Sequence, residues 1–418
     1  MIRFERFTLA NGLKVIYHQD KATPLVCMNI LYDVGARDEH PDHTGFAHLF
    51  EHLMFGGSVN IPNYDEPLQM VGGENNAFTN NDITNYYLTL PADNAETAFW
   101  LESDRMLSLA FTPKSLEVQR QVVIEEFKQR YLNQPYGDVW LLLKPLAYKV
   151  HPYRWNTIGK EISHIENATM EDVKDFFKRF YHPANAIMVV AGNIELEQVK
   201  TWSEKWFGPI PAQAKNERNL PEEPAQQEPR RLIVHRDVPA NSIYKAWHIC
   251  NRTDKSYHHF DLISDILSNG KSSRLYLSLV KEKKLFTEIN AYVSGDLDKG
   301  LFVVSGKLTA GTKAADAEKE IDEAVYEFVH KKLANEELQK VKNKVESVLS
   351  FSNTNVLNKA MNLAYYELLG DADLLNKEEE NYAGITSDDI IQTAQKYFTE
   401  QNAVSLHYLM NEAQATAN

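Results

Sequence analysis

A pattern that occurs twice, 217 residues apart, limits what this chain can fold into more than any other feature. Residues 169–185 and 386–402 each run from a threonine to an asparagine, with an aspartate three positions after the threonine. In both copies the threonine is a typical helix N-cap, an amphipathic helix follows it, and a β-branched run comes next. The sequence therefore predicts two copies of one α+β domain of about 200 residues each.

The tract between the two copies, residues 208–229, is rich in proline, glutamine and glutamate. This composition is typical of a linker. The prediction is an N-terminal domain at 1–220, a linker at 221–229 and a C-terminal domain at 230–418. The predicted fold class is α+β, and each domain is expected to be a mostly antiparallel sheet packed with helices.

The composition argues against two classes of partner. The 44 basic and 58 acidic side chains give a net charge of −14, whereas nucleic acids and anionic membranes require a basic surface. No apolar run approaches the roughly 20 residues of a membrane-spanning helix. Cys27 and Cys250 lie in apolar contexts, which favours two buried free thiols and a cytoplasmic location. A leader that had been removed would make the periplasm the alternative.

The stretch His48-x-x-Glu51-His52 predicts a metal site. If residues 44–56 form a helix, with Thr44 as N-cap and Gly56 as the left-handed stop, the two histidines lie one turn apart on one face. That geometry suits two nitrogen ligands on a single Zn2+. Glu51 then lies close enough to hold a water molecule without binding the metal. The alternative is that the three polar residues have this spacing by accident. A metal site therefore requires a third ligand elsewhere in the chain.

A second helix is predicted from Lys114 to about Tyr131, with Thr112 as N-cap and Pro113 at its first position. One stripe of this helix is formed by Gln119, Val122, Val123 and Glu126. This stripe is expected to be apolar except at its two polar ends, Gln119 and Glu126. A carboxylate on such a stripe is costly unless it is paired or bound to metal. Glu126 is therefore the predicted third zinc ligand. Its neighbour Glu125 is expected either to lie beside the ligands without binding the metal or to be solvated.

The Gly/Asn-rich stretch before residue 84 allows two interpretations. Residues 84–91 alternate as a strand, and the segment Asn76-Ala77-Phe78-Thr79 precedes them. This segment is either an edge strand to which an extended peptide could add by backbone pairing, or one arm of a plain hairpin. Composition does not decide between them.

Taken together, these residues resemble the pitrilysin/insulinase family of zinc peptidases, whose inverted metal motif defines the inverzincins. The resemblance is to the short two-domain form, to which mitochondrial processing peptidase is related, and it covers nearly the whole chain. The motifs that carry it are Asn11-Gly12-Leu13, Gly45-x-Ala47-His48-x-x-Glu51-His52-x-x-Phe55, Asn76-Ala77-x-Thr79, Glu125-Glu126, His182-Pro183-x-Asn185 and Ser272-Ser273-Arg274-Leu275.

The resemblance implies two homologous α+β domains that form a half-shell, and a dimer in which two half-shells enclose a chamber. It also implies that His48, His52 and Glu126 bind one Zn2+ per chain and that Glu51 is the general base. Residues 76–79 would be the edge strand that binds the substrate.

Two departures from the family pattern bear on function. Gln119 stands where the family often has a glutamate, and we expect this change to tune the site without inactivating it. In the second half, the family's active members carry an arginine and a tyrosine that engage the substrate carbonyl. Here Val280 and Thr287 occupy these positions.

The prediction is therefore a zinc metalloendopeptidase that hydrolyses unfolded peptides in an enclosed chamber. The chain would be the zinc-bearing subunit of a heterodimer whose homologous partner carries the arginine–tyrosine pair, although a homodimer is possible. The rival from another class is a non-catalytic structural core subunit of the same fold. A zinc hydrolase acting on other substrates is a third reading, but it leaves the edge-strand motif unexplained.

Overall fold

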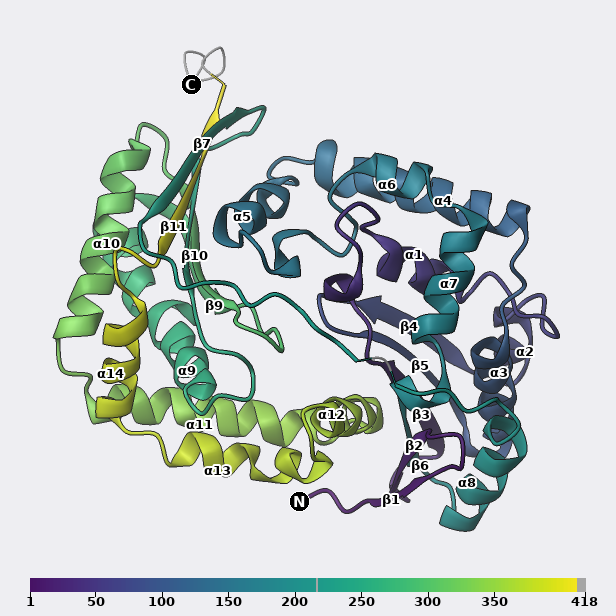
Figure 1. Ribbon diagram of the computed structural model, residues 1–418. Coiled ribbons are helices and arrows are strands. Elements are labelled where there is room, and N and C mark those ends of the chain that lie inside the picture. Colours follow the sequence, from purple (N-terminus) through teal and green to yellow (C-terminus); the bar gives the residue numbers. More distant parts are fainter. Residues whose placement is uncertain (216, 412–418) are drawn as a thin grey trace. The chain divides into compact units, whose positions relative to one another are not determined.

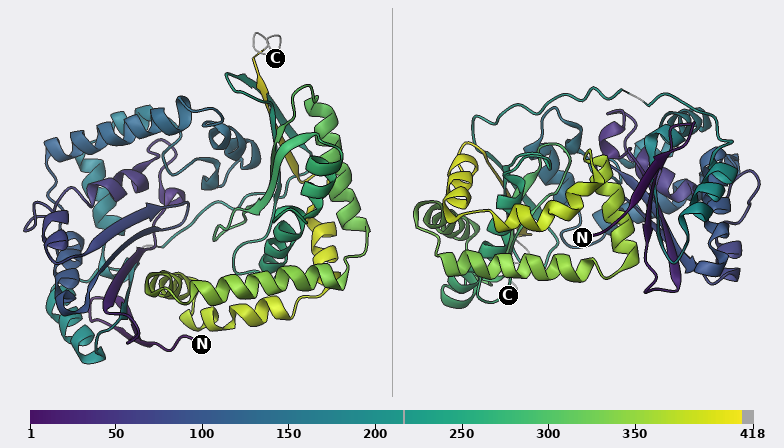
Figure 2. Two further views of the ribbon diagram at one scale, coloured as in Figure 1. Left: turned by 180° about the vertical axis from the view of Figure 1, so that it is seen from behind. Right: turned by 90° about the horizontal axis from the view of Figure 1, so that it is seen from below.

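Residues 1–215 and 217–411 are described by the computed structural model (Figures 1 and 2). They form two mixed β-sheets packed with helices, and neither sheet closes into a barrel. The predicted α+β class is therefore confirmed. None of the helices in the described residues combines the length and apolar character needed to cross a bilayer. Cys27 and Cys250 are both buried free thiols, as their contexts predicted.

The first sheet has the strand order β1-β2-β6-β3-β5-β4. All neighbouring strands in it are antiparallel except β2 and β6, which run parallel. Its strands are β1 (Glu5–Thr8), β2 (Lys14–Gln19), β3 (Leu25–Tyr32), β4 (Glu74–Thr79), β5 (Thr84–Pro91) and β6 (Ala186–Gly192).

The second sheet, in the order β7-β11-β8-β10-β9, repeats the part of the first sheet that runs from β2 to β4, and its one parallel pair, β7 and β11, corresponds to β2 and β6. Its strands are β7 (Arg230–Arg236), β8 (Ser242–His248), β9 (Phe286–Val293), β10 (Leu301–Leu308) and β11 (Ala403–Met410). The strand that enters the middle of each sheet, β6 or β11, follows one copy of the repeated sequence pattern.

The repeated pattern forms the same local structure twice. Helices α7 (Met170–Phe180) and α14 (Ser387–Tyr397) both start with a capping box. In each box the threonine oxygen accepts the aspartate N–H at 3.2 Å. At the other end, Asn185 donates to the carbonyl of Phe180 at 2.9 Å, and Asn402 donates to that of Tyr397 at 2.8 Å. Thus the threonine fixes the start of each helix and the asparagine fixes its exit into the strand.

The remaining helices are distributed over both halves of the sequence. They are α1 (Phe46–Leu53), α2 (Asp65–Met70), α3 (Glu96–Leu107), α4 (Pro113–Phe127), α5 (Val139–Ala147), α6 (Ile162–Glu166), α8 (Leu196–Trp202), α9 (Tyr257–Ser268), α10 (Ala314–His330), α11 (Asn335–Ser352), α12 (Val356–Leu368) and α13 (Glu378–Ala383). The helix predicted to reach about Tyr131 is α4, and a π-helical turn at Lys128–Leu132 continues it.

The compact units of the structure exchange segments between the two halves of the sequence. The first unit consists of Met1–Lys128, Trp155–Leu220 and Leu349–Glu378. The second consists of Gln129–Arg154, Pro221–Val348 and the segment that starts at Glu379. The chain therefore passes between the units five times, and one passage, from Leu220 to Pro221, lies where the linker was predicted to begin.

Two helices account for the exchange. The helix α12 comes from the second half of the sequence but packs on the first sheet, where Ala360 and Leu363 join a core with Ile16, Cys27 and Val189. The helix α5 comes from the first half and packs on the second sheet; Val139 and Leu143 join a core there with Ala246, Val303 and Leu406. An apolar helix face shows that a helix is buried, but not which sheet buries it.

This exchange predicts that residues 1–220 do not fold when they are produced alone. Without α12, the face of the first sheet formed by Ile16, Leu31 and Val189 would meet water. Each such side chain contributes about 1.5–3 kcal/mol when buried, and several of them outweigh the roughly 5–15 kcal/mol that separates a folded domain from its unfolded chain. Circular dichroism of the fragment should show no cooperative thermal transition.

The control for this truncation is a chimera of 1–220 fused through a flexible linker to 349–378. It restores the missing helix, and we expect a cooperative transition to return. A cooperative transition in the unfused fragment, at a temperature near that of the whole chain, would contradict the role assigned to α12.

Candidate metal centre

The helix α1 carries the two motif histidines, and it starts differently from the prediction. Its N-cap is Gly45, which has a left-handed φ of +90°, and not Thr44. The Thr44 side chain is buried and engaged elsewhere, because its Oγ1 accepts the N–H of Lys160 at 2.8 Å and lies 2.8 Å from Nδ1 of His164. A threonine that has these partners is not available to cap the helix.

The end of α1 also departs from the prediction. The helix stops at Leu53, and the left-handed residue is Gly57, with φ +96°, and not Gly56. Close packing explains why a glycine is needed at 57, since a Cβ there would come within 2.5 Å of the Pro62 carbonyl oxygen. The consequence is an eight-residue helix with His48 in its first turn and His52 in its last.

The structure brings the three predicted ligands together. Oε2 of Glu126 lies 3.6 Å from Nε2 of His48 and 3.3 Å from Nε2 of His52. The candidate ligand atoms all lie within 4.8 Å of one another, and no other group of three or more His, Cys, Asp or Glu in the described residues is placed to hold a metal ion. Three ligands at about 2.0–2.1 Å from a tetrahedral zinc ion would be about 3.4 Å apart. The donor set and its spacing therefore fit zinc.

Helix α4 delivers Glu126 to the two histidines. Its start is fixed by a capping box in which Thr112 accepts the N–H of Ser115 at 3.0 Å, with Pro113 at the first position, as predicted. Val123 is fully buried, but Val122 is 43 % exposed, so the expectation of an apolar stripe is wrong at Val122. Gln119 is half-buried on the same helix, two turns before Glu126.

The neighbouring Glu125 does not approach the histidines. It is exposed, and its Oε1 accepts a hydrogen bond from Nζ of Lys128 at 2.7 Å. Of the two alternatives for Glu125, the structure supports solvation. The pair Glu125–Glu126 thus separates into one side chain that faces water and one that faces the candidate ligands.

Glu51 is tied to the edge of the first sheet. The hydroxyl of Thr79 donates to Oε2 of Glu51 at 2.6 Å. Thr79 is the last residue of β4, so this hydrogen bond joins the candidate general base to the strand predicted to bind substrate. The sequence contained both residues in motifs but gave no sign that they touch.

The strand β4 is an edge strand and also one arm of a hairpin with β5, and the addition of a peptide to this edge stays a prediction. It comes last in the order of the first sheet. Asn76 and Ala77 lie opposite Tyr87 and Tyr86 of β5. Phe78 points outward and is 39 % exposed, which places an aromatic side chain next to Thr79.

Two family models match this chain. The model described as Insulinase (Peptidase family M16) matches residues 14–143, and the model described as Peptidase M16 inactive domain matches residues 167–345. The chain belongs to peptidase family M16. All residues of the candidate metal centre lie within the first match.

Individual relatives within family M16 agree with this assignment. The zinc protease PqqE of Helicobacter pylori is 28 % identical, over 97 % of this chain and 92 % of its own length. The crystal structure of a protease from Helicobacter pylori covers 98 % of this chain and all of its own, with a TM-score of 0.92 and 28 % identity. The mitochondrial-processing peptidase subunit beta of Saccharomyces cerevisiae is 27 % identical, over 49 % of this chain and 44 % of its own length.

A buried arginine, Arg105, packs against the tyrosine that is hydrogen-bonded to α1, and no sequence motif marked it. The guanidinium of Arg105 pairs with Glu102 at 2.6 Å and lies 4.5–5.3 Å from the ring centroids of Phe55, Tyr64 and Tyr86. Burial raises the pKa of Tyr86 well above its usual value, so its hydroxyl keeps a proton. That hydroxyl donates to the carbonyl of Phe50 in α1 at 3.4 Å. The sequence does hint at the ion pair, because opposite charges stand three residues apart at 102 and 105, a spacing at which side chains meet on a helix.

The two positions at which the family resemblance implies an arginine and a tyrosine lie in the second unit. Val280 is in a π-helical turn at Tyr276–Glu282, and Thr287 is on the edge strand β9. The hydroxyl of Thr287 donates to the carbonyl of Lys307 at 3.2 Å on the neighbouring strand. Neither side chain can supply the positive charge or the phenol that the family resemblance implies at these positions.

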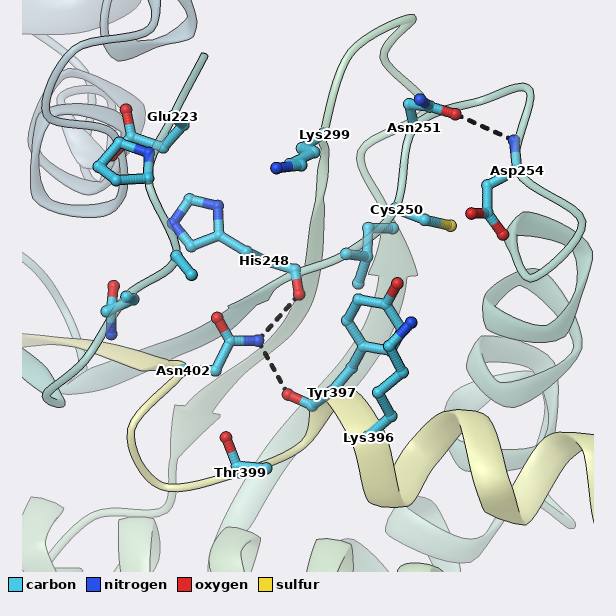
Figure 3. Close-up of a pocket in the computed structure, with 14 residues that line it drawn as sticks. Glu223, His248, Cys250, Asn251, Asp254, Lys299, Lys396, Tyr397, Thr399 and Asn402 are labelled. Carbon is cyan, nitrogen blue, oxygen red and sulfur yellow. Dashed lines mark hydrogen bonds between the residues drawn. The ribbon is translucent and has the colours of Figure 1, made fainter.

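The second unit also contains a cavity of about 420 Å³, which Figure 3 shows in close-up. Its acidic and imidazole groups are engaged by the surrounding backbone. Glu223 accepts the N–H groups of Lys149, Val150 and His151 at 2.8–3.0 Å, and Nε2 of His248 lies 3.0 Å from the carbonyl of Ala147. These contacts fasten the linker to the second unit, and they offer no alternative to the centre on α1 and α4.

Proposed function

We propose that this protein is a zinc metalloendopeptidase that hydrolyses unfolded peptides. One observation carries the proposal: His48, His52 and Glu126 converge from two helices, and Glu51, which lies on the same helix as the histidines, is hydrogen-bonded to an edge strand. When bound, zinc would supply a Lewis acid that lowers the pKa of water and polarises the scissile carbonyl. His48, His52 and Glu126 would hold it.

In the proposed reaction, Glu51 takes the proton from the attacking water and delivers it to the leaving amine. Its hydrogen bond from Thr79 fixes Oε2 and so restricts rotation of the carboxylate. The peptide would bind as an added strand along β4, through backbone pairing at residues 76–79. Phe78 lies on the exposed side of that strand, where it can contact a substrate side chain.

The proposal includes a partner. The oxyanion of an acyl-transfer reaction requires donors beyond the metal, and Val280 and Thr287 do not provide them. We propose a heterodimer with a homologous subunit that carries the arginine–tyrosine pair. The yeast relative is itself named a subunit, which supports this arrangement, and a homodimer is the alternative. The two buried free thiols support a cytoplasmic location as part of the same proposal.

A non-catalytic core subunit is the second candidate. The match of residues 167–345 to a model described as an inactive domain favours it, as do Val280 and Thr287. The intact set of His48, Glu51, His52 and Glu126 favours the peptidase, because a purely structural subunit does not require four convergent polar side chains.

The test is a fluorogenic-peptide assay with added zinc. This chain is measured alone and mixed with a homologous subunit from the same source that carries the arginine–tyrosine pair, and each measurement is repeated with Glu51→Gln. We expect turnover in the mixture only, and its loss with Glu51→Gln.

Three outcomes separate the alternatives. A full rate from this chain alone would contradict the heterodimer but not the peptidase. Turnover that Glu51→Gln leaves unchanged would contradict the proposed mechanism. The absence of turnover in every mixture, with the zinc centre loaded, would favour the structural subunit.

A further inference from the structure

Glu39 lies at the start of the helix that carries the histidines, although it is seven residues before Phe46, the first residue of that helix. Its Oε2 accepts the N–H of Gly45 and its Oε1 accepts the N–H of Ala47, both at 2.9 Å. The residue is only 6 % exposed. The first N–H groups of a helix have no partner within the helix, so this one buried carboxyl does the work that a threonine N-cap was expected to do.

The backbone at Gly45 makes this arrangement possible. Its φ of +90° turns the chain so that two N–H groups, two residues apart, reach the same carboxyl. A side chain would not fit at 45, because a Cβ there would lie 2.7 Å from the Ile158 carbonyl oxygen and 2.9 Å from Cδ1 of Ile165. His48 directly follows Ala47, whose N–H is held by Glu39. The carboxyl therefore fixes the backbone from which the first histidine extends.

Glu39 is itself held firmly. The turn just before it donates two backbone hydrogen bonds, from Ala36 to the carbonyl of Asn80 at 3.1 Å and from Arg37 to that of Asn81 at 2.9 Å. Nε1 of Trp155 donates to the carbonyl of Ala36 at 2.8 Å. Residues 80 and 81 directly follow Thr79, which binds Glu51. One connected set of hydrogen bonds thus links the start of α1 to the end of β4.

We propose that Glu39 is a positioning residue of the metal centre, which sets the place of His48 by capping α1 from a distance. The proposal deepens the proposed function and rests on its zinc site. An ionised carboxyl offers two oxygen acceptors, whereas the amide of a glutamine offers only one. Glu39→Gln therefore leaves one helix N–H unpaired in a buried place, while the size of the side chain hardly changes.

Burial raises the pKa of Glu39 to about 8, and the N–H groups of Ala47 and Gly45 act in the opposite direction. These N–H groups bind the ionised carboxyl more strongly than the protonated one, so glutamate and glutamine are compared above that pH, where the carboxylate accepts both hydrogen bonds.

The experiment measures zinc affinity by competition with a chelator and the visible absorption spectrum of the cobalt-substituted protein, which reports coordination geometry. We expect Glu39→Gln to raise the Kd for zinc about ten-fold, the low end of the effect of residues that orient metal ligands, and to alter the cobalt spectrum. Thermal unfolding of the zinc-free protein is recorded in parallel.

A matched control is available in the second unit. Glu318 is also a buried glutamate with several partners, among them Oγ of Ser405 at 2.6 Å and Nε2 of His407 at 2.7 Å. We expect Glu318→Gln to lower the melting temperature but to leave the zinc Kd and the cobalt spectrum as in wild type. This comparison separates a positioning effect from general loss of stability.

The results with the Glu39 variants can overturn its proposed role in positioning His48. A wild-type zinc Kd and cobalt spectrum in Glu39→Gln would overturn the proposal, whatever its melting temperature. If that variant does not fold, Glu39→Asp, which keeps two acceptors on a shorter side chain, is measured in the same way, and an unchanged Kd again overturns it. Failure of wild type to bind zinc would instead overturn the proposed function, so the two failures are distinguishable.

Discussion

Replacing Glu51 by glutamine is expected to lower kcat for a fluorogenic peptide by about 10²–10⁴-fold, the usual contribution of a general acid–base group. The glutamine keeps the shape of the side chain, and its carbonyl oxygen can still accept the hydrogen bond that Thr79 donates at 2.6 Å to Oε2 of Glu51. It cannot take a proton from water. Because Glu51 is not among the three candidate ligands, the zinc content of the variant should equal that of wild type.

The measurement is steady-state kinetics in the active assembly together with metal analysis of the same samples. Thr79→Val serves as an intermediate case, because it removes the donor to Glu51 but leaves the carboxylate in place. We expect a smaller loss of kcat there than in Glu51→Gln. A Glu51→Gln protein that retains zinc and turns over at the wild-type rate would show that another group moves the proton.

Replacing Glu126 by glutamine is expected to weaken zinc binding by more than about 100-fold, since changes to residues that merely orient ligands already cost 10–100-fold. Glu126 supplies a carboxylate oxygen that lies within 3.6 Å of both imidazole nitrogens. Zinc at 100 times its Kd stabilises a folded protein by about 2.7 kcal/mol. The rise in melting temperature on adding zinc should therefore disappear in the variant.

Glu125 provides the control, because it makes the same substitution possible one position earlier in α4. Its carboxylate is exposed and pairs with Lys128 at 2.7 Å. Glu125→Gln should keep both the zinc Kd and the zinc-dependent rise in melting temperature. Equal effects of the two substitutions would mean that the helix has turned so that either glutamate can reach the metal, which contradicts the observed geometry.

The meeting of the three candidate ligands could be predicted because it depends on the spacing of residues within two helices. His48 and His52 lie one helical turn apart, so their shared face follows from spacing alone. Glu126 could be identified because a carboxylate among buried positions is costly without a partner. The same reasoning failed at Val122, where the helix surface is exposed although the sequence pattern is apolar.

The features that could not be predicted depend on contacts between residues that are separated in the sequence. Glu39 caps α1 across a loop, and no spacing rule connects a carboxyl at 39 with N–H groups at 45 and 47. Thr44 was the better N-cap by residue type, but its hydroxyl is engaged by Lys160 and His164. Local preference was overridden by tertiary contacts that only the folded chain reveals.

The exchange of α5 and α12 between the sheets was hidden for a related reason. Both helices have apolar faces, and both were compatible with packing inside their own half of the sequence. The repeat pattern at 169–185 and 386–402 did predict the matching helix–strand units. It carried no information about the segments between the copies, because the two helices that cross over lie outside it.

The place of α12 in the sequence also fixes the order in which the protein can be completed on the ribosome. All strands of the first sheet have been synthesised once Gly192 is made, but the helix that covers one face of that sheet ends at Leu368. At about 5–20 residues per second, the wait lasts roughly 10–35 s. Throughout that interval an apolar sheet face is bare, so the first unit cannot be finished early and must be kept from aggregating until late in its own translation.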